Sequence, residues 1–230
     1  MNKHILVPTV IAITSLTVQA QVPIATDHVD IGIGYELGAF DLHIHQESPV
    51  ETEFAPDEAF FVIGPAAAAA SPGGAYTGFL GAAGSPVWIL PTAEHPELPF
   101  LGFGTEELDA ADWLGNIDLT LTAVNGPGGF SLWSVNAFGT PNLRMGTADG
   151  IDASDRLSLI PGSHGHFNLG FTAPGTYEVT VQATGTHATD GLRTSDLATY
   201  RFDVVPEPST WAMLVLGTGA LLFFARRSRR

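Results

Sequence analysis

The feature that most constrains the fold is an alternation of apolar and polar residues in short segments that glycine and proline separate. Successive side chains of a β-strand point to opposite faces, so each segment predicts a strand with one apolar and one polar face. Roughly ten such segments occur, which is typical of proteins built almost wholly from strands. We therefore expect an all-β fold, an antiparallel β-sandwich of the immunoglobulin-like or jelly-roll type.

The first two segments, 28–35 and 40–46, predict a β-hairpin closed by a four-residue loop around Gly38. The register that keeps both apolar faces together is fixed by the alternation, because a slip of one residue would turn every side chain over. The expected cross-strand pairs are Ile33–Leu42, Ile31–Ile44, Asp30–His45 and Gly32–His43.

Both ends of the chain differ from the middle. Residues 1–20 combine Lys3, an apolar run and a small residue at Ala20, which predicts a secretory signal peptide. Residues 205–230 contain two prolines, an apolar run from Trp211 to Ala225 and a basic end. As a helix, Thr210 to Ala225 covers ~24 Å, and flanking side chains at the two interfaces make up the remaining bilayer thickness. The expected interfacial residues of this transmembrane helix are Trp211, Arg226, Arg227, Arg229 and Arg230.

This ending, with Pro206-Glu207-Pro208, an apolar helix and terminal arginines, resembles the PEP-CTERM sorting signal of Gram-negative bacteria. The resemblance implies export, recognition of Pro206, Glu207 and Pro208 by an exosortase, and processing there. The expected protein is membrane-anchored at the cell envelope and then lies at the cell surface or in the extracellular matrix.

The middle of the chain, 21–204, has the length of one domain, and its charge and composition exclude several functions. The net charge of −15 understates its acidity, because Lys3 and the four terminal arginines lie outside it. Nucleic acid is therefore an unsuitable partner, since phosphate binding requires clustered basic residues. The domain has no lysine and no cysteine, and Ser163 lacks the glycine that a nucleophile elbow requires. We expect a protein that is not an enzyme.

Paired histidines are the strongest chemical signal. His43/His45 and His164/His166 are His-x-His pairs, and residues i and i+2 of a strand share a face about 6.6–6.8 Å apart. Two imidazoles so placed can share a metal ion once a third ligand comes from a neighbouring strand. With no thiolate available, the expected ion is zinc, copper, nickel or manganese. We expect both pairs to converge on one site, with Asp30 or Asp41 as a ligand or an orienting group; the alternative is a polar face on which histidines pair with carboxylates.

Several segments of the domain together resemble the surface-anchored domain named choice-of-anchor M. The segments that carry the resemblance are 28–32, 88–91, 101–107, 128–133, 162–168 and 171–177. The family occurs on bacterial surfaces with different anchoring tails, PEP-CTERM among them, and implies a surface role. Two alternatives to metal binding stay open: a structural or adhesive matrix component, and a saccharide-binding module in which Trp88, Trp113 and Trp133 bind exopolysaccharide. Two of these tryptophans lie within alternating apolar segments, which favours core packing over a saccharide platform.

Overall fold

Residues 20–48 and 50–206 fold into three β-sheets, and the only helices among them are short 3₁₀ turns. The computed structural model describes residues 20–48 and 50–206, and the all-β class expected from the alternation is confirmed over these residues. The 3₁₀ turns are η1 (Pro65–Ala67), η2 (Gly78–Leu80) and η3 (Ala110–Asp112). In the described ranges no helix is long and apolar enough to cross a bilayer. The expected transmembrane helix, and the signal peptide up to residue 19, lie outside them.

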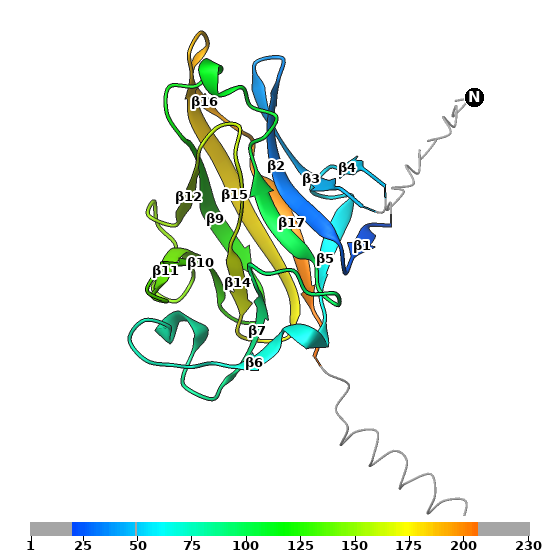
Figure 1. The fold of residues 1–230 in the computed structure, drawn as a ribbon, viewed down its shortest axis with the longest axis vertical. Helices are drawn as coiled ribbons and strands as arrows, with labels where there is room; N and C mark the ends of the chain where they lie inside the picture. The colour runs from blue at the N-terminus through cyan, green and yellow to red at the C-terminus, as the bar shows by residue number, and fades with distance from the viewer. Residues whose placement is uncertain (1–19, 49, 207–230) are drawn as a thin grey trace, which may run out of the picture.

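One sheet has seven strands and forms the broad diagonal body of the molecule (Figure 1). Its order is β1 (Val22–Ile24), β5 (Ala59–Ile63), β17 (Ala198–Val204), β15 (Gly175–His187), β9 (Ile117–Asn125) and β12 (Arg156–Leu159), with β16 (Gly191–Thr194) paired to β15. We call it the large sheet. β16 and the hairpin of β2 and β3 lie at one end of the molecule, and β6 lies at the other (Figure 1).

Two five-stranded sheets complete the fold. The order of one, which we call the histidine sheet, is β13 (His164–His166), β8 (Phe100–Gly104), β2 (His28–Glu36), β3 (Ala39–Gln46) and β4 (Thr52–Phe54). The other, the third sheet, is β11 (Pro141–Gly146), β10 (Phe130–Val135), β14 (Asn168–Phe171), β7 (Pro86–Leu90) and β6 (Ala68–Ala70). Apolar side chains of all three sheets meet in one core.

The expected hairpin is confirmed in all four of its predicted pairs. Val29, Ile31 and Ile44 are at most 4% exposed and face the core. The loop is shorter than expected: Glu36 pairs with Ala39, and only Leu37 and Gly38 turn the chain. Both have positive φ, 50° and 84°, which matches the twist of the strands as type I′ hairpin turns do.

Strand direction is mixed, where the sequence predicted a wholly antiparallel arrangement. β1 with β5, β5 with β17 and β2 with β8 are parallel pairs, and the other strand pairs of the described residues are antiparallel. Alternation gives the faces of a strand but not the direction of its neighbour. Parallel partners are joined by long crossovers, and those leave no local pattern.

Three tryptophans that could have offered a saccharide platform are buried instead. Trp88 and Trp113 are both 6% exposed in the main core, and Trp133 is 5% exposed in a smaller cluster with Leu80 and Val87. A platform needs exposed ring faces, so these three residues do not form one, and the core packing that the sequence favoured for them is confirmed.

Candidate metal centre

Both His-x-His pairs and Asp30 lie on the polar face of the histidine sheet, in two rows that run across its strands. One row reads His166, Gly102, Asp30 and His45, and the other reads His164, Gly104, Gly32 and His43. The two His-x-His pairs therefore do share one face of one sheet. Asp30 and His43 are buried there, at 2% and 4% exposure, rather than facing solvent as a polar strand face usually does.

Glycines between the histidines make this burial possible. A side chain at Gly102 would collide with the Asp30 carboxylate and lie 2.5 Å from Nε2 of His164. A side chain at Gly32 would collide with the His43 ring. Because these positions carry only hydrogen, the imidazole rings and the carboxylate lie directly over the backbone of β8 and β2.

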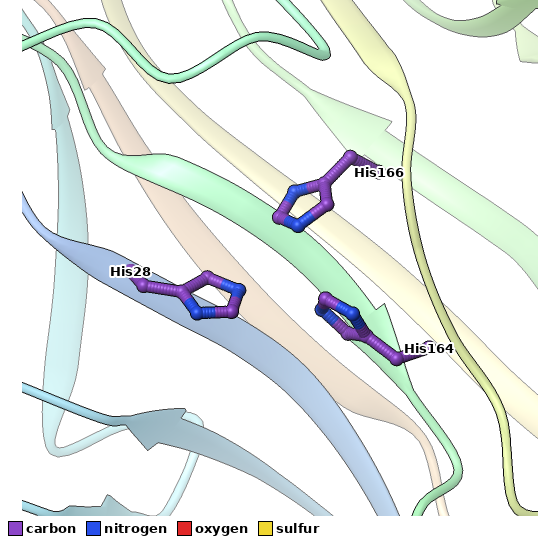
Figure 2. A group of neighbouring side chains, drawn as sticks. All are labelled: His28, His164 and His166. Atoms are coloured by element: carbon purple, nitrogen blue, oxygen red, sulfur yellow. The ribbon is translucent and has the colours of Figure 1, made fainter.

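Three histidines form the tightest group, which we call the three-histidine cluster: His28, His164 and His166. One ring nitrogen of each lies within 4.8 Å of the others, and ring centroids are 4.7–5.2 Å apart. His28 comes from β2, and it faces His164 and His166 of the edge strand β13 across β8 (Figure 2). The three imidazoles thus converge from two strands that are not neighbours.

Each ring is held through another contact. Nδ1 of His28 lies 2.7 Å from Oε2 of Glu47, and Nδ1–H of His166 donates to the Leu101 carbonyl at 3.0 Å. Nε2–H of His164 donates to Oδ1 of Asp30 at 2.9 Å. Histidines that ligate metals in proteins are typically oriented by such a hydrogen bond from the other ring nitrogen. Nε2 of His28 is buried and has no hydrogen bond among the described residues.

The electrostatics favour a neutral ring at His166. Burial lowers the pKa of His166 from its ordinary value, and the neighbouring rings of His164 and His28 lower it further, against a raising effect of the hydrogen bond to Leu101. Phe100 stacks on His166 with ring centroids 3.7 Å apart and shields that ring from water. A neutral imidazole presents the lone pair that a metal ion requires.

His43 and His45 stand apart from this cluster, where the sequence predicted one shared site. They group with Glu107 instead. Two strands, β8 and β2, separate β13 from β3, which places the strands that carry the two pairs about 14 Å apart at ~4.8 Å per strand. Of the two expected carboxylates, Asp30 contacts His164, whereas Asp41 lies beside His43 with Oδ2 3.7 Å from Nδ1.

His28 is the residue that the sequence reasoning missed. The alternation of β2 places it on the face of Asp30, which was visible in the sequence. Its role depends on the parallel pairing of β2 with β8, and that pairing has no local signal.

Comparison with known proteins identifies the end of the chain. The PEP-CTERM protein-sorting motif matches residues 204–230. This chain carries that sorting signal. No curated protein and no solved structure shows significant similarity to the chain.

The PEP-CTERM motif implies exosortase-dependent export and sorting to the cell surface, with a membrane-anchored stage at the envelope. It begins where β17 ends at Val204. Val205 is 42% exposed and donates its N–H to the Ile63 carbonyl, and Pro206 is the last described residue. Glu207, Pro208, Trp211 and the terminal arginines lie within the matched segment but outside the described residues.

Proposed function

We propose that this protein is an exosortase-sorted surface protein whose β-domain binds a divalent cation through His28, His164 and His166. The observation that carries the proposal is the convergence of three imidazoles, each oriented by a carboxylate or a backbone carbonyl. A nitrogen-only donor set suits zinc, copper or nickel better than manganese. The acidic chain raises the local concentration of cations, which favours loading.

We infer a binding role rather than a catalytic one. The carboxylates beside the cluster, Asp30 and Glu47, are occupied by contacts to His164 and His28. Neither is therefore free to act as a general base on a bound water. We assign residues 21–204 to a β-sandwich surface domain of the choice-of-anchor M type. The sequence segments that resemble that family support the type, and the common core of three sheets that precedes the sorting motif agrees with a single β-domain.

The metal proposal predicts that His28→Ala lowers the affinity of the purified full-length chain for one equivalent of Zn²⁺ by at least about tenfold. One of three converging ring nitrogens is removed, and Glu47 loses the ring that it contacts. Competition with a chromophoric chelator measures the affinity. His95→Ala is the matched control, because His95 belongs to none of the metal-capable groups of the described residues. Equal affinities in the two variants for every equivalent of Zn²⁺ that the chain binds would contradict the three-histidine cluster as a site.

The sorting proposal adds a processing step. We expect Trp211–Ala225 to hold the chain in the membrane until the exosortase acts at Pro206-Glu207-Pro208. Mass spectrometry of the protein from its native host should show a mature form that lacks the apolar segment and the terminal arginines. Recovery of only the intact chain through Arg230 from membranes would leave a plain membrane anchor as the function of the tail.

A structural or adhesive matrix role is the competing function, with exopolysaccharide as the partner. Exposed leucines such as Leu37, Leu114 and Leu192 are ordinary on a protein surface, so this role rests on the cell-surface destination that the sorting motif implies. If a variant that binds no Zn²⁺ is still retained in an exopolysaccharide matrix, that result would support the matrix role over the metal-binding role.

A further inference from the structure

A second group of side chains on the histidine sheet lacks the partners that buried polar groups normally have. His43 is 4% exposed, and among the described residues neither of its ring nitrogens makes a hydrogen bond. Nε2 of His45 is likewise buried without one. Buried side-chain polar atoms in folded proteins are nearly always satisfied, so three unsatisfied ring nitrogens on residues two positions apart point to a place where a cation or a water molecule can bind.

Glu107 brings a carboxylate to these rings. Its Oε1 lies 3.0 Å from Nε2 of His43, at ion-pair distance but outside hydrogen-bond geometry. One donor atom each from His43, His45 and Glu107 lies within 4.8 Å of the others. A side chain at Gly34 would lie 2.6 Å from Oε2 of Glu107, so that glycine leaves room for the carboxylate.

A small cavity adjoins this group. Its volume is about 80 Å³, and its lining includes Asp30, His45, Glu106 and Glu107. A single water molecule needs roughly 10–15 Å³ of such space, so the cavity is large enough for a cation that keeps one or two water molecules. Glu106 adds a second carboxylate at its wall.

We propose that His43, His45 and Glu107 form a second divalent-cation site, separate from the three-histidine cluster. Two imidazoles and a carboxylate are a common donor set for zinc, with the remaining position open to water. The carboxylate makes this site harder and more anionic than the three-histidine cluster, and manganese suits it better than it suits three imidazoles.

A different account of the same contacts is that His43 and His45 are protonated and form ion pairs. Nδ1 of His43 is 3.7 Å from Asp41, and Nε2 of His45 is 3.5 Å from Glu51. On that account no cation is bound, and neutralising Glu107 changes stability but not metal content. The number of bound metal ions therefore separates the two accounts.

The test is the zinc content of the purified full-length chain after equilibration with Zn²⁺ and removal of excess metal, measured by native mass spectrometry. We expect two zinc ions per chain in the wild type, one in Glu107→Gln, one in His28→Ala and none in the double variant. Glu107 is 46% exposed and Gln is nearly isosteric, so the fold should survive. Glu36→Gln, at the exposed end of β2, is the matched control for loss of one negative charge and should keep both ions.

The two sites fail in distinguishable ways. If the wild type binds one zinc ion, and that ion is lost in His28→Ala but kept in Glu107→Gln, the second site is overturned and the three-histidine cluster stands. If that single ion is instead kept in His28→Ala and lost in Glu107→Gln, the three-histidine cluster is overturned and the second site stands. Absence of zinc from all folded variants would overturn both. If Glu107→Gln were unfolded by circular dichroism, the half-buried His45 would be changed to Gln and the same counts applied.

Discussion

Gly102→Ala is expected to lower the Zn²⁺ affinity of the three-histidine cluster by more than about 100-fold. The added methyl group would collide with the Asp30 carboxylate and with Nε2 of His164, so it displaces an orienting group and a ligand together. The backbone of Gly102 needs no positive φ, and the alanine therefore acts through this collision rather than through strain of the main chain. Competition titration against a chelator measures the change.

Gly104→Ala is the control for this substitution, two residues further along β8. A methyl group there would meet Oε2 of Glu106 at 3.6 Å and Cβ of Asp30 at 4.0 Å, both ordinary contact distances. We expect its Zn²⁺ affinity to stay within about twofold of the wild type. Similar Zn²⁺ affinities of the two variants would mean that the ring of His164, which lies over Gly102, does not bind the ion.

Phe171→Ala is expected to lower the free energy of unfolding by about 3–5 kcal/mol. Phe171 is fully buried, and its ring lies 5.0 Å from that of Tyr177 and 5.4 Å from that of Phe202. It belongs to the third sheet, whereas both neighbours belong to the large sheet. Its removal therefore opens a cavity where two sheets meet.

Phe138→Ala makes the same chemical change at a side chain that is 94% exposed, and it should alter the free energy of unfolding by less than about 0.5 kcal/mol. Urea denaturation followed by circular dichroism compares the two variants. Equal midpoints would show that Phe171 does not join the third sheet to the large sheet.

Strand pairing was predictable from sequence where both strands alternate apolar and polar residues and a short turn joins them. The hairpin of β2 and β3 is such a case, because two alternating segments and a short turn fix its register. The shorter turn at Leu37 was missed, since leucine rarely adopts a positive φ.

The candidate site was only half predictable, because its decisive strand gives a poor strand signal. β8 reads Phe-Leu-Gly-Phe-Gly, and glycine disfavours strands. The structure explains these glycines, since Gly102 leaves space for Asp30 and His164. The rule that glycine disfavours strands therefore failed at β8, the strand over which the histidines lie.

The segment 164–171 shows a second limit of pattern reading. Its alternation predicts one strand, but the chain leaves the histidine sheet at Phe167 and enters the third sheet as β14. The alternation of residue types runs through Phe167 without interruption, so the sequence does not reveal the change of sheet.

The hydrogen bond between Asp30 and His164 joins residues 134 positions apart. The three rings face one another only after β2 has paired with β8 and β8 has paired with β13. The cluster is therefore absent from a chain that is only partly synthesised or partly translocated. A cation could be captured only when folding is nearly complete. If the exported chain folds after translocation, the metal supply outside the cytoplasm, and not that at the ribosome, decides which ion the proposed cluster binds.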